Sequence, residues 1–390
     1  MDFSTETDHD PMDDLDGGSR GDLMTEVRIA LRTGAPINFL SLSCSFLTQL
    51  EVPYPSEGPG DPGDLVSLLS YVDAFIDIQT PETTALLAVL AVLVAHPATR
   101  QRCGAEVARR RDRLPPWLAR LDEASVTRVA RLTDQTGDAD LVVLELRLAG
   151  GHLLTFMVLI DHNLDHIVKQ VGVLACSADE VIDSFVHARP DPPIGASVVD
   201  LVAADARVMV AEAIRRADDV YPPYTSVTWP ACRPLLEMAL GTLPAGGTAP
   251  LRVGWSPEQV DMLAREFLTS PELELLDVLE LDEDDAELVV RTIVDLAASH
   301  GGGDPMRWSG TRVGYLLLDL LPRTSMSEAH LVEALPGVLS AFVRFCGRER
   351  GVDEEQVGAT LREVAELADP FRKLMLDHAS VDPLDDPPPS

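Results

Sequence analysis

The chain has 390 residues, of which 46% are hydrophobic, and a formal net charge of −33 at pH 7. This length suits two or three domains, and the apolar content allows each of them to bury a core. The negative charge disfavours direct binding to nucleic acids and to anionic membranes, because few cationic side chains are available to displace counterions from phosphates.

Composition also bears on the compartment. The five cysteines are far apart and include no C-x-x-C pair, so the sequence encodes neither a disulfide framework nor a zinc knuckle. The acidic N-terminal stretch contains no apolar segment of the secretory kind. The longest apolar run, Ala85–Ala95, is too short to cross a bilayer as a helix. We therefore expect a cytoplasmic protein.

The first part of the chain is expected to be helical. Residues 1–22 are polar and acidic, and we expect a disordered tail because they can bury little surface. Apolar spacing then predicts helices within 23–121, namely two between Leu23 and Leu50 that are separated at Pro36, followed by Leu65–Ile78, Pro81–Ala95 and Ala98–Asp112. The arginines between Arg100 and Arg113 form a dense basic patch. We interpret it as a solvated face paired with carboxylates rather than as a partner or phosphate site.

A small antiparallel β-meander is predicted over residues 126–176. Gly150-Gly151 stands between two apolar runs, which is typical of a β-hairpin. The expected strands are Val126–Leu132, Leu141–Leu148, Leu153–Ile160 and Val171–Ala175. Helices from the flanking segments would cover one face of this sheet, so the predicted fold class is α+β and mostly helical.

Helices are again expected over 177–243. Ser177 and Glu180 have the spacing of a capping box, which predicts a helix start. The expected helices are Ser177–His187, Ala203–Asp218 and Pro230–Leu243. The small residues and prolines of 244–250 predict a linker, so the α+β domain would span 23–243.

Residues 251–378 are predicted to form a separate, all-helical domain. Ser256 and Gln259 have the spacing of a second capping box, with a proline at the first helical position. Further helices are expected at Ala286–Ser299, Thr311–Leu321, Ser327–Arg348 and Asp353–Asp377. The apolar stripe of a bundle core is formed by Leu331, Leu335, Val338, Phe342 and Phe345. Residues 379–390 are expected to be a disordered tail.

The clearest candidate site follows the second strand of the hairpin. Asp161 and His162 stand at its end and Lys169 follows shortly after, so these three are candidates for acid–base or small-ligand chemistry. If 163–170 is helical, His162 and His166 lie on one face at a spacing that lets two imidazoles share a metal ion. Asp161 would then supply a carboxylate to zinc, manganese or iron.

Asp165 is a further possible carboxylate ligand for the same metal ion. A structural interpretation is the alternative, and it is favoured because no H-E-x-x-H pattern and no distant third ligand is evident. In that interpretation Asp161 caps the following turn, His162 hydrogen-bonds the meander and Lys169 pairs with a carboxylate.

Cys232 and Arg233 are the other candidates. A thiol beside an arginine at a helix start is a candidate low-pKa cysteine, although a buried cysteine that anchors the helix is the stronger interpretation. The sequence contains no G-x-S-x-G elbow, Walker motif or dinucleotide fingerprint.

Several segments together resemble a family of uncharacterised proteins from high-GC Gram-positive bacteria, and the likeness covers nearly the whole chain. The resemblance implies no assigned activity, substrate or cofactor. The family places a glycine and an acid where this chain has Asp165 and Gln170. The segments that carry it are Glu26–Gly34, Pro115–Leu118, Asp161–Leu164 with Lys169, Trp229–Pro234, Gly303–Ser309, Leu320–Arg323 and Ala334–Leu339.

From these observations we expect a non-catalytic protein that works through protein–protein contact, as an interaction or regulatory module. The alternative is a metal-assisted hydrolase or small-ligand enzyme with its site at Asp161 and His162. A protein partner is expected, without nucleic acid or membrane, and no cofactor apart from the divalent metal of that alternative.

Overall fold

The structure of the protein is a computed structural model. It describes residues 13–51, 68–133, 136–187, 197–220, 224, 226, 228–249, 254–274, 281–324, 326 and 328–379.

The first part of the chain is helical, as predicted. Its described helices are α1 (Asp13–Arg32), α2 (Pro36–Glu51), α3 (Leu68–Asp77), α4 (Pro81–Leu93), α5 (Pro97–Arg109) and α6 (Pro116–Ala119). α1 begins at Asp13, inside the segment 1–22 that was expected to be a disordered tail. Once a turn has nucleated a helix, each further residue adds a backbone hydrogen bond at little cost, so a helix can extend into a polar segment. Residues 1–12 lie outside the described residues.

The α+β class is confirmed by a five-stranded antiparallel sheet with strand order β4-β3-β2-β1-β5. The strands are β1 (Ser125–Thr133), β2 (Ala139–Arg147), β3 (Leu153–Asp161), β4 (Ile167–Leu174) and β5 (Ser197–Asp200). The first four form the predicted meander. Gly150 and Gly151 join β2 to β3 with φ of 87° and 83°, a conformation that glycine adopts without the cost of a Cβ.

Strand β5 was not predicted. It contains four residues and pairs only with β1, so it has too few alternating positions to produce a recognisable pattern. Its position at the edge of the sheet follows from that single pairing.

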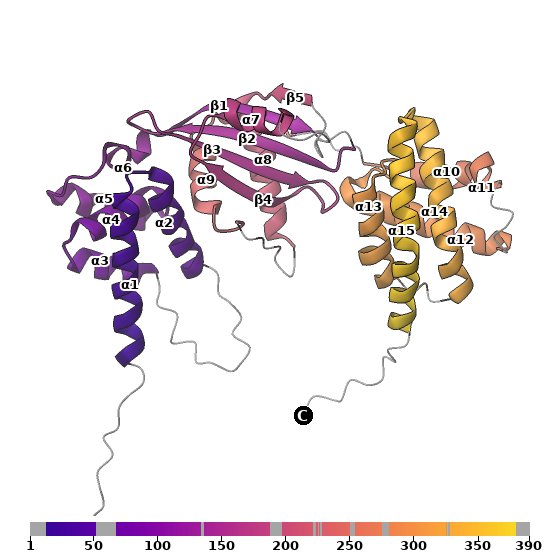
Figure 1. The fold of residues 1–390 in the computed structure, drawn as a ribbon, viewed down its shortest axis with the longest axis horizontal. Coiled ribbons are helices and arrows are strands. Elements are labelled where there is room, and N and C mark those ends of the chain that lie inside the picture. Colours follow the sequence, from indigo (N-terminus) through magenta and orange to yellow (C-terminus); the bar gives the residue numbers. More distant parts are fainter. Residues whose placement is uncertain are drawn as a thin grey trace, which may run out of the picture.

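The two faces of the sheet bury different sets of apolar residues. On β2, Val142 and Leu144 join a large cluster, while Leu141 and Val143 point to the other face and join a smaller one. The large cluster includes α8 (Ala203–Asp218) and α9 (Arg233–Gly241), and the smaller one includes α7 (Ala178–His187). Figure 1 shows α7 and the pair α8 and α9 on opposite sides of the sheet.

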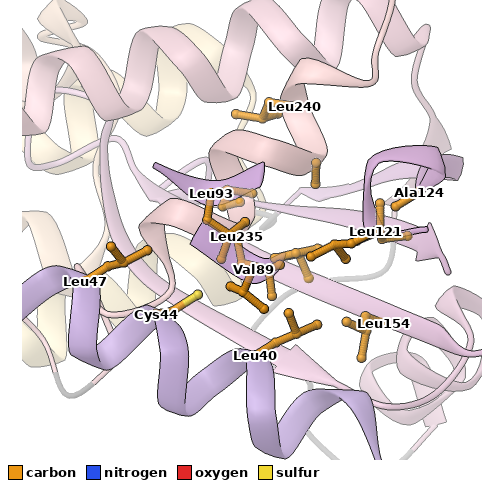
Figure 2. Close-up of a cluster of buried hydrophobic side chains, with 14 of the residues drawn as sticks. Leu40, Cys44, Leu47, Val89, Leu93, Leu121, Ala124, Leu154, Leu235 and Leu240 are labelled. Carbon is orange, nitrogen blue, oxygen red and sulfur yellow. The ribbon is translucent and has the colours of Figure 1, made fainter. Parts of the chain in front are cut away.

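The large cluster also joins the N-terminal helices to the sheet. Figure 2 shows Leu40 of α2, Val89 of α4, Leu154 of β3 and Leu235 of α9 converging on one region. Each fully buried side chain of this size contributes roughly 1.5–3 kcal/mol relative to an exposed one. The N-terminal helices, one face of the sheet, α8 and α9 therefore share one core.

The last part of the chain is helical. Its described helices are α10 (Pro257–Leu268), α11 (Pro271–Glu274), α12 (Glu283–Ser299), α13 (Gly310–Tyr315), α14 (Ala329–Arg350) and α15 (Glu354–Ala379). The capping box of Ser256 and Gln259 is present, and the predicted apolar stripe of α14 is buried. The helix expected over Thr311–Leu321 becomes a π-helical turn after Tyr315. Residues 380–390 lie outside the described residues.

Helix α14 is long and apolar enough to span a bilayer, but 67% of the relevant window is buried inside the structure. The central helix of a helical bundle meets the same criteria, so this property is weak evidence for a membrane span.

The segment predicted as a linker separates two apolar clusters. The described members of one cluster end at Leu243, and those of the other begin with Trp255. The segment itself is held against α8. The backbone N–H of Thr248 donates to Asp205 at 2.7 Å, and a Cβ on Gly247 would stand 2.0 Å from the carbonyl oxygen of Ala204.

Candidate functional site

A cleft of about 620 Å³ lies where the end of the sheet meets α8 and the C-terminal helical part. Figure 1 shows the helical part beside the end of the sheet at which β3 turns into β4. Side chains from both parts line this junction cleft. The lining residues are Gly137, Asp140, Ile160, His162, His166, Met209, Glu212, Ala213, Arg216, Ala249, Gly301, Gly302, Asp304 and Arg307.

Arg307 connects the two parts of the chain. Its Nη1 donates to Asp138 Oδ1 and its Nη2 to Asn163 Oδ1, each at 2.6 Å. Ser309 Oγ also donates to Asp138 Oδ1 at 2.7 Å. Asn163 and Arg307 lie in two of the segments that carry the family resemblance. These segments therefore meet in space, although 144 positions separate the two residues.

Asp138 is the buried centre of this contact. Burial by itself raises the pKa of this carboxyl group, but hydrogen bonds from Asn163 and Ser309 and the charge of Arg307 outweigh burial and lower the pKa. Asp138 is thus ionised and saturated with donors. Truncating one partner of such a buried pair leaves a charge without compensation, which usually costs about 3–5 kcal/mol.

His162 and His166 form a histidine pair at the sheet end of the cleft. Their Nδ1 atoms are 2.5 Å apart, and their ring centroids are 4.4 Å apart. The other nitrogen of His162, Nε2, lies 3.2 Å from Asp140 Oδ2. A carboxylate and two imidazoles therefore form one hydrogen-bonded chain.

This chain restricts where protons can lie. A bond between two Nδ1 atoms needs one donor and one acceptor, so only one of the two can carry a proton. Burial, followed by the charges of His162, Arg216 and Arg307, lowers the pKa of His166 to about 4. His166 is therefore neutral at pH 7. Its Nε2 is buried without a hydrogen-bond partner among the described residues.

Gly302 explains how the C-terminal part can approach the pair. A Cβ at this position would stand 3.1 Å from His166 Nε2, and the φ of Gly302 is +83°. Both the close approach and the backbone conformation favour glycine. The contact makes His166 part of the junction between the two parts.

The segment 162–166 is a turn between β3 and β4, so the helix over 163–170 on which the metal hypothesis depended is not formed. Asp161 Oδ1 accepts the backbone N–H groups of Asn163 and Leu164, which closes the turn. Asp165 and His166 then adopt φ of 58° and 61°, a conformation that Asp and His visit more readily than most residues. The histidines meet through this turn and not through helical spacing.

Asp161 and Lys169 lie outside the cleft lining. Lys169 Nζ donates to Asp161 Oδ2 at 2.6 Å, and the carboxylate is buried. Both oxygens of Asp161 are thus committed to the turn and to Lys169. The structural interpretation of these two residues fits the geometry.

The metal hypothesis is not supported by the geometry. Within the described ranges no group of three or more His, Cys, Asp or Glu side chains is arranged to hold a metal ion. Asp161 faces Lys169 instead of the histidine pair, and the two imidazoles use their Nδ1 atoms for each other. The predicted set of Asp161, His162, Asp165 and His166 is therefore not assembled as a metal site.

Cys232 and Arg233 are remote from the cleft lining. Burial raises the pKa of the Cys232 thiol, which favours the interpretation of a cysteine that anchors the helix over that of a reactive low-pKa thiol. Arg233 donates to Asp218 and Glu237 and lies 5.8 Å from the centroid of the Trp229 ring. These contacts tie α9 to α8 and leave Arg233 in a structural role.

The basic patch of α5 is partly structural as well. Arg110 is buried, where it pairs with Glu106 and donates to the carbonyl oxygens of Phe75 and Ile76. Arg102 pairs with Asp73. The pairing with carboxylates agrees with our interpretation, but the Arg110 side chain is buried and does not belong to a solvated face.

Sequence reasoning missed most of the cleft. Asp140, Glu212, Arg216, Asp304 and Arg307 line it but were not candidates. One signal was available, because a hairpin centred on Gly150-Gly151 brings the start of β2 beside Asp161 and His162. The observed backbone bond from His162 N to Asp138 O, at 2.8 Å, follows from this register.

The fold and the cleft thus define an α+β protein with a junction site between its sheet and its C-terminal helices. Comparison of the chain with protein-family models, with curated proteins and with solved structures finds no match.

Proposed function

We propose that the protein is a non-catalytic regulatory protein that binds a small ligand in the junction cleft and acts through protein contacts. The observation that carries this proposal is the cleft of about 620 Å³ with lining residues from both parts of the chain. Small-molecule sites usually have volumes of roughly 300–1,000 Å³ and lie where structural units meet.

The position of the cleft favours regulation. A ligand there contacts Ile160 and His162 of the sheet region, Met209 of α8 and Gly302 of the helical part at once. Its binding free energy therefore depends on how the two parts are arranged. By linkage, the ligand shifts the population toward the arrangement that it binds best. A cytoplasmic protein partner that recognises one arrangement would respond to the ligand.

The lining side chains favour binding over covalent catalysis. Among the described residues that line the cleft there is no serine, threonine, cysteine or lysine to act as a nucleophile. The carboxylates of the lining accept hydrogen bonds or ion pairs from neighbouring side chains, so they are not poised to take a proton.

A second candidate function, acid–base catalysis, is favoured by the chain of Asp140, His162 and His166. A carboxylate that orients an imidazole is the usual support of a general base. Substituting His162→Gln removes the link between Asp140 and His166. If the native protein chemically converts a ligand of the cleft and the His162→Gln variant does not, the enzyme is favoured over the regulatory protein.

Filling the cleft tests the proposed function. Ala249 lines the cleft and is exposed, so Ala249→Trp would occupy the site without disturbing a core, while Ala245→Trp on the same segment is the matched control. A ligand at about 100 times its Kd stabilises the folded protein by about 2.7 kcal/mol, which raises the thermal midpoint by several degrees. We expect members of a metabolite panel to raise the midpoint of the native protein and of Ala245→Trp but not of Ala249→Trp. Equal shifts in all three proteins would contradict a ligand site in this cleft.

A further inference from the structure

We infer that the ligand of the junction cleft is a small organic anion with an apolar body, held by Arg216 and Arg307. This inference rests on the proposed function and adds the chemical class of the ligand. It follows from comparing which polar groups of the cleft already have partners and which have hydrogen-bonding capacity left.

The three carboxylates of the cleft already have partners. Asp140 accepts from Thr133 at 3.0 Å and contacts His162. Glu212 accepts from Arg215 and from Arg216 at 2.8–2.9 Å. Asp304 pairs with Arg350 at 2.7 Å and accepts the backbone N–H of Met306. A cationic ligand would have to displace these donors.

The two guanidinium groups have donors left. Arg216 uses Nε for Glu212 and, at 3.4 Å, Nη1 for the carbonyl oxygen of Asp165, and no described residue accepts from its Nη2. Arg307 uses both Nη atoms for Asp138, Asn163 and backbone carbonyls, and no described residue accepts from its Nε. Apart from Nε2 of His166, the unused hydrogen-bonding capacity among the described cleft residues therefore consists of the N–H donors of the two arginines. Carboxylate and phosphate oxygens are the acceptors that guanidinium groups bind best.

The rest of the lining is suited to an apolar body. Ile160 at the end of β3, Met209 and Ala213 of α8, and Ala249 of the linker border the same space as the two arginines. Met209 is a flexible, polarisable side chain that adapts to the shape of a ligand. An anion with an aliphatic or aromatic body would bury apolar surface here while its head group meets the arginines.

Neutral His166 is compatible with this class of ligand. His166 does not add a positive charge at pH 7, because burial lowers its pKa to about 4. Selectivity for an anion therefore depends on the two arginines. This dependence can be tested by substitution.

Four probes with the same phenyl group and propylene chain separate the classes by head group. They are 4-phenylbutyrate, 3-phenylpropyl phosphate, the neutral 4-phenylbutanamide and the cationic 3-phenylpropylamine. Binding of each to the full chain is measured by isothermal titration calorimetry at pH 7. We expect the carboxylate or the phosphate to bind about 10- to 100-fold more tightly than the amide and the amine, the range of a charge-assisted hydrogen bond. Which of the two anions binds more tightly decides between a carboxylate and a phosphate ligand.

Two neighbouring arginines of α8 provide a matched pair of variants. Arg216 lines the cleft, whereas Arg215 does not, although both donate to Glu212. Arg216→Gln should reduce the affinity for the anions at least about tenfold and abolish the preference over the amide, and Arg215→Gln should leave both unchanged. Circular dichroism of both variants checks that each is folded.

The outcomes separate this inference from the proposed function. If the amine or the amide binds as tightly as the anions, and Ala249→Trp abolishes that binding, the anion class is overturned while the ligand site remains. Equal losses in Arg215→Gln and Arg216→Gln also overturn it, because a general loss of charge on α8 would then explain the effect. If none of the four probes binds, the result contradicts both the anion class and the proposal that the junction cleft is a ligand site.

Discussion

The histidine pair is the residue-scale feature that distinguishes this cleft from an ordinary surface depression. Its short Nδ1 contact requires that the two imidazoles share one proton, and Asp140 holds the outer nitrogen of His162. The pKa of His166 is lowered to about 4, with burial as the largest cause. Protonating His166 would also place its charge beside Arg216 and Arg307.

Stability should therefore depend on pH through His166. Its folded-state pKa lies below the value of about 6.5 for an unfolded chain, so the unfolded state binds the proton first. The contribution of His166 to the free energy of unfolding is therefore fully present above about pH 6.5 and is lost as the pH falls toward 4. We expect His166→Gln to flatten this decrease, measured by urea unfolding between pH 7 and 4.5.

The control is His152→Gln in the exposed β2–β3 turn, which should retain the native slope. The pH range stops above the window in which Asp138 and Asp140 would protonate in the unfolded chain. An unchanged slope in His166→Gln would show that the pair does not control this pH dependence.

At the scale of the residue, the sequence identified only part of the site. His162 and His166 were predicted to lie together, and they do, but the assumed helix is a turn with two positive φ values. Asp161 and Lys169 were candidates for a chemical site, but their hydrogen bonds fit the favoured structural interpretation, in which Asp161 caps the turn and Lys169 pairs with a carboxylate. Arg307 could not be predicted as a site residue from the sequence, because it contacts Asp138 and Asn163, which lie 169 and 144 positions away. Local periodicity carries no information about such pairings.

At the scale of the element, most helices and strands could be predicted because their signals are local. The capping boxes of α7 and α10, the hairpin glycines and the apolar stripe of α14 all act within a few residues. β5 was missed because a four-residue edge strand has no such signal. Composition predicted the linker 244–250 but not the close packing of Gly247 and Thr248 on α8.

Gly247 is the residue that permits this packing. A Cβ there would stand 2.0 Å from the Ala204 carbonyl oxygen, which is backbone and cannot rotate away. Gly247→Ala should therefore displace the segment and destabilise the protein by about 1–3 kcal/mol, the usual cost of overpacking. Denaturant unfolding measures this change.

Gly254→Ala is the matched control, since nothing lies within 4 Å of its Cβ position. We expect its stability to stay within about 0.5 kcal/mol of the native value. If Gly247→Ala were as stable as Gly254→Ala, the segment could not be packed against α8 as described.

At the scale of the whole molecule, two apolar clusters meet through a polar contact. Arg307, Asp138, Asn163 and Ser309 form its buried part, and the junction cleft lies beside them. A junction held by polar contacts can respond to a ligand, because contacts between the parts of a chain that are more polar than a core rearrange more easily. The proposed regulation and the proposed ligand class both depend on the ligand touching both parts.

Hydrogen–deuterium exchange of the full chain with and without 4-phenylbutyrate tests that claim most directly. If the cleft binds the anion, amide protons in 160–166, 209–216 and 301–307 should all become more protected, because these three segments border it. Ala249→Trp should show none of these changes. Protection confined to one part of the chain, or located instead outside these three segments, would contradict a ligand site at the junction.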